Sequence, residues 1–308
     1  MTQPNDAPTE APTDAPTDAS LTDRAFVLLQ LCLPTRWLSL LVFKLTQIRH
    51  VGFKNRLIRL FLRGYTIDLG EAEFENIESY ESFNHFFTRA LKPGARPLPD
   101  DAQVFVSPVD GTVSQFGRIG EDRMIQAKGH TFSVYDLLPG DAAARDFVGG
   151  EFCTIYLAPY NYHRIHMPIG GRLAHWTYVP GRLFSVNAAT ARALPNLFTR
   201  NERLNARFDT PAGPVALAMV GALFVGSLET VWSGRVTPPH LRSPSAGGQY
   251  APMQAVELPR GAEMGRFNMG STVILLAAPG AISWSSWLTL GQAIRLGETL
   301  GRWNPKRA

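Results

Sequence analysis

One short run of the sequence predicts a turn that leads directly into a buried strand: Met269-Gly270-Ser271-Thr272-Val273-Ile274-Leu275-Leu276. Glycine and serine are frequent in turns, and the unbroken apolar stretch after them is typical of a strand that is covered on both faces. Gly-Ser-Thr is a common tripeptide, so Ser271 taken alone is an ordinary turn residue. Its importance depends on which other residues the fold brings beside it.

The sequence on either side of this run also has mainly β character. Short apolar or alternating runs, separated by glycine and proline, predict strands at Val104–Val106, Gly111–Phe116, Cys153–Leu157, Arg172–Val179, Val215–Val225 and Thr272–Leu276. Aromatic residues at near-helical spacing predict a helix over Glu71–Leu91, ended by the Pro/Gly-rich stretch Pro93–Pro99, and the C-terminal stretch Leu288–Leu300 is also predicted helical. The predicted fold class is α+β: amphipathic N-terminal helices, then a mainly antiparallel β core with flanking helices.

The segment before this core, from Leu21 to about Tyr65, is both apolar and basic. Pro34 divides its apolar runs, and the longest uncharged stretch, Ala25–Thr35, has 11 residues, whereas a helix needs about 20 to span a bilayer. The segment contains no acidic residue after Arg24 and carries eight basic ones: Arg24, Arg36, Lys44, Arg49, Lys54, Arg56, Arg59 and Arg63. Apolar, cationic helices of this kind suit the interface of an anionic membrane.

Two other interpretations of this segment are open. The helices could cap the globular core with their basic side chains as a solvated face, because apolar helical stripes usually belong to a core. A nucleic-acid-binding arm is less favoured, because the high aliphatic content leaves little of the segment free to lie along phosphates. We expect membrane-surface attachment and no nucleic-acid partner.

Composition limits the remaining possibilities. The 308 residues are 45% hydrophobic, which is enough to bury a core, and the formal net charge is +4. Residues 1–20 repeat Ala-Pro-Thr followed by an acidic residue, which predicts a disordered acidic tail and not a signal peptide. Cys32 and Cys153 have no disulfide or metal-ligand spacing, so we expect no metal site and a reducing, cytosol-facing location.

Three local clusters contain residues that can carry chemistry. Asp110 lies in Ser107-Pro108-Val109-Asp110-Gly111, where an ordinary Asp-Gly hairpin turn is the simpler explanation. His163 and His166 lie three residues apart in an extended segment that ends at Pro168, a spacing that argues against both ligating one metal. Ser271 completes the set. An aspartate, a histidine and a serine on separate strand ends can meet as a charge relay in which Asp110 orients His166 and His166 deprotonates Ser271.

These residues lie within longer stretches that resemble the bacterial phosphatidylserine decarboxylases, the pyruvoyl-dependent prokaryotic type I enzymes. The resemblance covers nearly everything from about residue 25 onwards. It is carried by Gln126–His130, Tyr162–Pro168, Val179–Gly181, Leu183–Asn187, Asn201–Arg203, Glu229–Trp232 and Glu263–Phe267. The usual self-cleavage sequence of the family is Leu-Gly-Ser-Thr, and here Met269 replaces the leucine, a swap that keeps volume and apolarity.

The resemblance implies that Ser271 is used twice. It would first attack Gly270, with His166 as base and Asp110 fixing its tautomer, so that the chain is cut between residues 270 and 271. The β chain (1–270) and the α chain (271–308) would stay associated, and Ser271 would become a covalent pyruvoyl cofactor. That group would form a Schiff base with phosphatidylserine and release phosphatidylethanolamine. His163 would hold the substrate carboxylate or handle protons, and Ser185 is a weaker candidate at the same site.

The resemblance also implies a cell-membrane enzyme attached peripherally at the cytoplasmic face, and a homodimer. The expected division of the chain is the tail at 1–20, interfacial helices at 21–68 and a catalytic domain at 69–308. Two rival functions are a membrane-associated Ser-His-Asp lipid hydrolase and a non-enzymatic membrane-binding scaffold. The hydrolase has less support, because the sequence lacks a G-x-S-x-G elbow and Ser271 precedes a strand instead of a helix.

Overall fold

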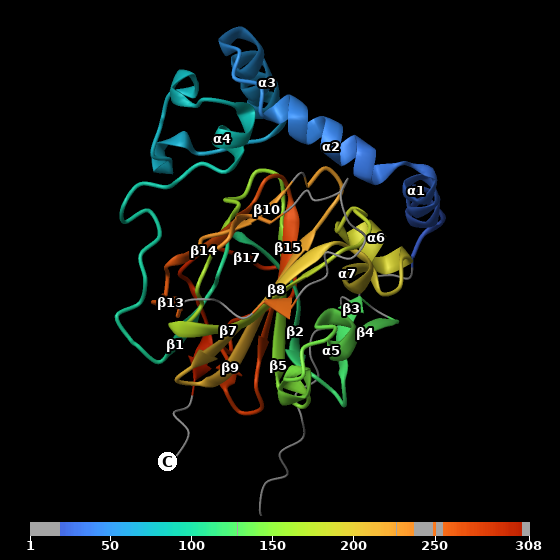
Figure 1. The fold of residues 1–308 in the computed structure, drawn as a ribbon, viewed down its shortest axis with the longest axis vertical. Helices are drawn as coiled ribbons and strands as arrows, with labels where there is room; N and C mark the ends of the chain where they lie inside the picture. The colour runs from blue at the N-terminus through green and yellow to red at the C-terminus, as the bar shows by residue number, and fades with distance from the viewer. Residues whose placement is uncertain (1–18, 128, 226, 237–248, 251–254, 304–308) are drawn as a thin grey trace, which may run out of the picture.

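The structure is a computed structural model that describes residues 19–127, 129–225, 227–236, 249–250 and 255–303. Most of the expected tail, residues 1–18, lies outside the described residues, as does Lys128 in one of the quoted stretches. The N-terminal helices form a layer across one end of a large β core (Figure 1). This arrangement confirms the predicted α+β class.

The N-terminal segment forms the expected helices, α1 (Leu21–Cys32), α2 (Thr35–Thr46) and α3 (Val51–Gly64). A capping box between Ser20 and Asp23 begins α1, and the break at Pro34 bends α2 by 79° relative to α1. In the part of the chain that the structure describes, no single helix is long and apolar enough to cross a membrane. Taken together as a bent pair, α1 and α2 have the length and the apolar composition of a membrane span.

The helix expected over Glu71–Leu91 is wrong for most of its length. The segment contains only η1 (Leu69–Glu71), η2 (Ile77–Ser79) and the single turn α4 (Phe83–Phe87). The hydroxyl of Tyr80 donates to the carbonyl of Phe74, which folds the chain back on itself. The aromatic side chains therefore form a compact cluster against α3 instead of one face of a long helix.

The main sheet is antiparallel, as predicted, and has nine strands in the described residues. Its order is β12 (Gln249–Tyr250), β7 (Gly171–Val179), β8 (Arg203–Thr210), β9 (Gly213–Gly221), β15 (Ser271–Ala277), β5 (Glu151–Leu157), β2 (Gly111–Arg118) and β17 (Ala293–Ile294), with β13 (Glu257–Leu258) also paired to β7. The strand that the sequence marked most clearly, β15, lies in the interior of the sheet. Each of its residues pairs with both β5 and β9, and every one is buried.

Smaller sheets surround this one. One joins β11 (Gly234–Arg235), β10 (Leu228–Thr230), β14 (Glu263–Phe267) and β6 (Arg164–His166), another joins β1 (Val104–Val106), β18 (Thr299–Trp303) and β16 (Ile282–Trp284), and β3 (Arg123–Ala127) pairs with β4 (His130–Ser133). The short helices α5 (Val134–Leu137), η3 (Ala144–Phe147), α6 (Ala188–Ala193) and α7 (Leu197–Arg200) complete the described elements.

The helix expected over Leu288–Leu300 is wrong. Gly291 and Gly297 interrupt this stretch with φ angles of 78° and 87°, a left-handed conformation that a right-handed helix cannot contain. The chain instead forms β17 and enters β18, which pairs with β1 and β16. The last described residues, in β18, are therefore hydrogen-bonded to a strand on each side.

We expect Leu275→Ala to lower the free energy of unfolding by about 2–5 kcal/mol, because this leucine in β15 is completely buried and its truncation leaves a cavity. Leu290→Ala is the matched control, because Leu290 is 53% exposed and its loss should cost less than about 0.5 kcal/mol. Urea unfolding followed by tryptophan fluorescence measures both changes. Equal losses in the two variants would contradict the interior position of β15.

Candidate active site

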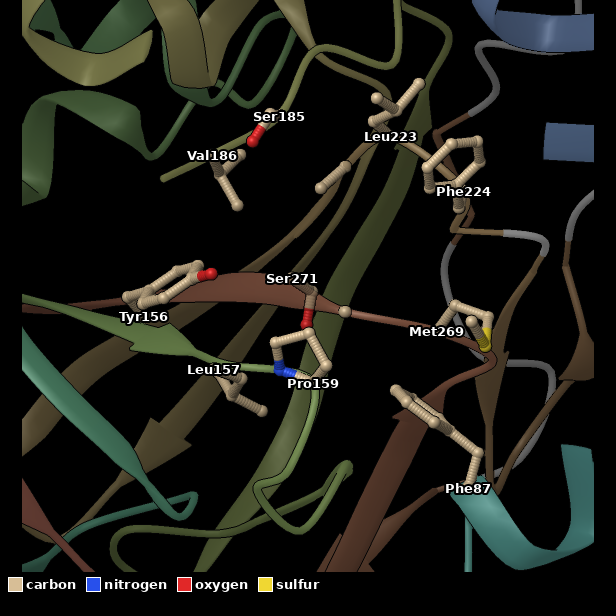
Figure 2. A pocket seen from close by; sticks show the side chains of 12 residues that line it. Phe87, Tyr156, Leu157, Pro159, Ser185, Val186, Leu223, Phe224, Met269 and Ser271 are labelled. Carbon is tan, nitrogen blue, oxygen red and sulfur yellow. The ribbon is translucent and has the colours of Figure 1, made fainter. Parts of the chain in front are cut away.

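Ser271 is the first residue of β15 and pairs with Leu157 of β5 on one side and Gly221 of β9 on the other. Its side chain is fully buried, and its Oγ has no hydrogen-bond partner among the described residues. A cavity of about 150 Å³ opens beside it. Figure 2 shows Ser271 at the centre of this cavity, whose other lining residues are Phe87, Tyr156, Leu157, Pro159, Ser185, Val186, Ala222, Leu223, Phe224, Met269 and Gly270.

The backbone just before Ser271 is strained. Met269 has a φ of 102°, a value that non-glycine residues rarely adopt and that costs about 1–3 kcal/mol. Gly270 is not among the residues with a positive φ, and an added Cβ there would meet only the Leu157 carbonyl oxygen at 3.8 Å. The backbone strain therefore lies at Met269, one residue before Gly270.

Residue 268 anchors this strained segment. The Asn84 amide donates to Asn268 Oδ1 over 2.8 Å, and the Asn268 amide donates to Glu229 Oε1 over 2.9 Å. The backbone N–H of Asn268 also donates to the Ser227 carbonyl. Met269 itself packs against the aromatic cluster of α3 and α4. With one neighbour clamped and its own side chain held, Met269 cannot relax without breaking buried contacts.

His163 is completely buried and carries a free lone pair. Its Nδ1 lies 2.8 Å from the Asn161 carbonyl oxygen, which can only accept, so the ring proton is on Nδ1. Its Nε2 has no partner among the described residues. Burial lowers the pKa of His163 to about 3, so the ring is neutral at pH 7. The ring lies 4.1 Å from the ring of Phe87, which lines the Ser271 cavity.

His166 is held by different partners. Its Nδ1 lies 2.8 Å from the Gly261 carbonyl oxygen, and its Nε2 lies 3.1 Å from the Tyr162 hydroxyl. The carbonyl requires a proton on Nδ1, so the Tyr162 hydroxyl donates to Nε2. Burial lowers the pKa of His166, and the bond to Gly261 opposes that shift. We expected Asp110 to fix the tautomer of His166, but in this structure the Gly261 backbone carbonyl fixes it.

Strand register separates the two histidines relative to Ser271. The Phe267 N–H donates to the His163 carbonyl, whereas His166 pairs with Glu263. Phe267 comes four residues before Ser271 and Glu263 eight. His166 therefore lies three residues, or about 10 Å, beyond His163 from the end of the strand that leads to Ser271. Separate roles for the two rings agree with this difference.

Asp110 is not in an ordinary hairpin turn, because β1 pairs with β18 while β2 pairs with β5. Its carboxylate accepts two bonds from Arg96, at 3.0 and 2.6 Å, and one from the Leu296 N–H at 2.8 Å. No hydrogen bond joins Asp110 to His166, or His166 to Ser271, within the described residues. The charge relay therefore stays a prediction, and in this structure Asp110 ties the 1–270 part of the chain to the 271–308 part.

Ser185 lines the same cavity as Ser271, and the walls around it are bonded to the N-terminal helices. The Ser185 N–H donates to Oε1 of Gln30 in α1 over 2.7 Å. The N–H of Phe224, a cavity residue with a φ of 70°, donates to Oγ of Ser39 in α2 over 3.0 Å. Both walls of the cavity are therefore positioned by helices far away in the sequence.

Sequence reasoning missed several residues that shape the site. Phe87 lay within a predicted helix and Tyr162 within a quoted motif, and neither was expected to shape the site. The Tyr162 hydroxyl donates a hydrogen bond to Nε2 of His166. Arg96 lies in the Pro/Gly-rich stretch that was expected only to end a helix, but it binds both Asp110 and Glu71. Burial lowers the pKa of Arg96, and these two carboxylates raise it by more. Tyr162 and His166 are only four residues apart, but the sequence does not show which way their side chains point, and the contacts of Phe87 and Arg96 join separate segments, so only the folded chain reveals them.

Comparisons with known proteins identify the family of this chain. The family model described as phosphatidylserine decarboxylase matches residues 83–302, and one described as PSD matches residues 25–66. A phosphatidylserine decarboxylase proenzyme from Ectopseudomonas mendocina is 48% identical over 91% of this chain and 99% of its own length. Another from Nitrosococcus oceani is 50% identical over 92% of each chain. The chain therefore belongs to the phosphatidylserine decarboxylase family.

Proposed function

We propose that this chain is a proenzyme that cuts itself between Gly270 and Ser271, converts Ser271 into a pyruvoyl group and then decarboxylates phosphatidylserine to phosphatidylethanolamine. The observation that carries the proposal is the state of Ser271. It begins a central strand, follows a strained residue, opens onto a cavity and has a buried hydroxyl without a partner in the described structure. A merely structural buried serine is normally hydrogen-bonded.

Self-cleavage needs one nucleophile and one base. Ser271 Oγ attacks the Gly270 carbonyl carbon, the peptide C–N bond breaks, and the nitrogen leaves as the amine of Ser271 while an ester forms. Removal of the Ser271 Cα proton then breaks the Cβ–Oγ bond and releases Gly270 as a carboxylate. Water hydrolyses the resulting dehydroalanine to the pyruvoyl group and ammonia. Strain at Met269 raises the energy of the intact peptide and so lowers the barrier to attack.

We assign the base to His166 with Asp110 as its orienting partner, and decarboxylation to His163. This assignment requires His166 to exchange its bond from Tyr162 for one to Ser271. The free Nε2 of His163 and its position at the cavity end of the strand support the reverse assignment, in which His163 is the base. Because both rings carry their proton on Nδ1, either one can accept a proton at Nε2.

The surroundings of Ser271 fit a covalent pyruvoyl group. Such a group supplies a ketone that bonds the substrate amine and takes up the electron pair left when carbon dioxide departs. Phe87, Met269 and Leu223 give the cavity an apolar wall that excludes water. A neutral His163 beside Phe87 offers Nε2 as a hydrogen-bond acceptor and adds no charge to the apolar wall.

The two fragments would stay together without a peptide link. All of β15 belongs to the 271–308 fragment, and its partners β5 and β9 belong to the 1–270 fragment. Asp110 and Glu71 add polar contacts to Leu296 and Arg295 across the same boundary. The cut therefore removes one covalent bond and leaves both ladders of the central strand in place.

We propose peripheral attachment to an anionic membrane at the cytoplasmic face, and the N-terminal helices support the attachment to a membrane surface. Their exposed apolar side chains include Leu21, Leu28, Leu29, Leu31, Trp37, Leu41, Leu45 and Leu60. A lipid substrate stays in the bilayer, so these helices would bring the cavity to the head group. The bonds from Gln30 and Ser39 to the cavity walls connect the docking helices directly to the site.

The proposed boundaries assign membrane docking to the helices at 21–68 and the reaction to a catalytic domain at 69–308. The homodimer implied by the resemblance stays a prediction, which analytical ultracentrifugation would test. A lipid hydrolase or a scaffold would remain one intact chain, whereas the proenzyme yields fragments 1–270 and 271–308, the smaller one with a pyruvoyl mass in place of a free amino terminus.

We expect Ser271→Ala to abolish cleavage, because the nucleophile is lost. His166→Ala should also block cleavage, whereas His163→Ala should cleave and then fail to decarboxylate. Denaturing gels and release of carbon dioxide from phosphatidylserine measure the two steps. If His163→Ala stops cleavage and His166→Ala does not, the roles of the two histidines are reversed.

Met269→Gly should slow self-cleavage by about 5- to 30-fold, because glycine adopts a φ of 102° without strain and the intact peptide becomes more stable. Met269→Leu is the matched control, since it keeps both the side-chain volume and the strain. Its cleavage rate should equal that of the unmodified chain. A time course of fragment appearance on denaturing gels compares them, and equal rates for the two variants would show that strain does not contribute.

Replacing Lys44, Arg56, Arg59 and Arg63 with glutamine should weaken binding to anionic vesicles by about 100-fold or more at low salt, because each exposed cation near the surface contributes about 1 kcal/mol. Lys54 is left in place because it is buried and hydrogen-bonded. The matched control replaces four exposed arginines elsewhere, Arg118, Arg123, Arg145 and Arg172. Vesicle sedimentation measures binding, and gels should show normal cleavage in both variants. Equal binding by the two would disprove the docking surface.

A further inference from the structure

Arg89 is a buried cation without a counter-ion in the described structure. It is 5% exposed, and its Nε and Nη1 have no hydrogen-bond partner. Its one hydrogen bond runs from Nη2 to the Tyr160 carbonyl oxygen at 3.3 Å, and its guanidinium lies 5.8 Å from the centre of the Phe86 ring. An unpaired buried charge costs several kcal/mol, so its presence calls for an explanation.

Arg203 shows how this fold treats an arginine with a purely structural role. It is 2% exposed, and it donates to the carbonyl oxygens of Leu137, Thr199 and Asn201 at 2.9, 2.7 and 3.1 Å. Arg203 is thus buried with its hydrogen-bonding capacity largely used. Arg89 is buried to a similar extent with two of its three nitrogens idle, which is the state of a group that awaits an anionic partner.

The position of Arg89 connects it to the Ser271 cavity. It follows Phe87 by two residues, and Phe87 both lines the cavity and stacks on His163. The carbonyl that holds Arg89 belongs to Tyr160, whose neighbour Pro159 lines the same cavity. The positive charge of Arg89 also lowers the pKa of His163, which places the two groups within electrostatic reach.

We infer that Arg89 binds the phosphodiester of the lipid head group and positions the substrate amine beside residue 271. Ser271 and Phe87 line the same cavity, the His163 ring lies against Phe87, and Arg89 follows Phe87 by two residues. Ser271, His163 and Arg89 each carry a buried polar atom without a partner among the described residues. The guanidinium presents idle donors in the planar arrangement that suits phosphate oxygens. This inference rests on the proposed activity and adds a positioning residue to it.

The phosphodiester is a better ligand for Arg89 than the carboxylate, for a kinetic reason. The carboxylate loses its negative charge as carbon dioxide leaves, so a guanidinium bound to it would stabilise the substrate more than the transition state and slow the reaction. The phosphodiester keeps its charge throughout. Binding there holds substrate and transition state equally, which lowers KM without opposing the chemical step.

The test is Arg89→Gln in the full-length chain, assayed with short-chain phosphatidylserine as substrate and phosphatidylethanolamine as competing product. The product retains the phosphodiester and lacks the carboxylate. We expect KM for phosphatidylserine and the inhibition constant of phosphatidylethanolamine to rise together by about 10- to 100-fold, as for loss of a charged hydrogen bond, with kcat changed less than about threefold. Arg89→Lys, which keeps a charge without the planar fork, should lie between.

Arg145→Gln is the matched control, because Arg145 has a side chain that is 80% exposed and lies outside the cavity lining. It should leave both constants unchanged. Arg89→Gln should cleave itself normally and keep or raise its melting temperature, because it removes an unpaired buried charge. A lower melting temperature or lost cleavage would show that Arg89 is structural and overturn the inference.

A rise in KM for phosphatidylserine without a change for phosphatidylethanolamine would assign Arg89 to the carboxylate and also overturn it. Unchanged constants for both lipids would do the same. The proposed activity fails separately: in that case the unmodified chain itself would form no phosphatidylethanolamine.

Discussion

β15 is hydrogen-bonded along its whole length to β5 on one side and β9 on the other, and Ser271 is its first residue. A reactive residue in this position is held by two ladders, so its backbone cannot drift when the peptide before it breaks. The apolar residues after it are completely buried and keep the strand in place. The fold therefore separates two tasks: the strand fixes the reacting atom, and the segment before it, from Asn268 to Gly270, is where bonds can change.

Around that fixed point, the structure leaves selected polar groups without partners. Most buried polar side chains in the described chain are satisfied, as Gln126 and Asn201 illustrate with their bonds to backbone groups. Ten buried side-chain atoms of the described residues have no partner. Four of them are Ser271 Oγ, His163 Nε2 and two nitrogens of Arg89, and the others lie on Asn84, Thr154, Thr177, Asn205, Trp232 and Thr272. Each such group costs stability unless something binds it. Ser271 shares its cavity with Phe87, the His163 ring lies against Phe87, and Arg89 follows Phe87 by two residues, an arrangement expected of a site that is completed by its substrate.

Hydrogen bonds also connect the cavity to α1 and α2, the helices whose apolar side chains are exposed. Gln30 accepts a hydrogen bond from the Ser185 N–H, and Ser39 accepts one from the Phe224 N–H. Neighbouring leucines on the same helices are exposed. A helix that lies in a membrane interface is thereby a direct structural neighbour of the reaction site. This geometry explains why basic, apolar helices and a small buried cavity occur in one chain: a lipid head group must reach the cavity while its acyl chains remain in the bilayer.

Local patterns were sufficient for much of this protein. The strands at Val104–Val106, Cys153–Leu157 and Thr272–Leu276, the break at Pro34 and the basic helices all follow from periodicity and turn residues close together in the sequence. The helices expected over Glu71–Leu91 and Leu288–Leu300 failed, because packing of aromatic rings on α3 and left-handed glycines outweighed helical spacing. Only the tertiary structure placed the strain at Met269 and paired Asp110 with Arg96. It alone also left Arg89 without a partner, because these properties depend on contacts between residues far apart in the chain.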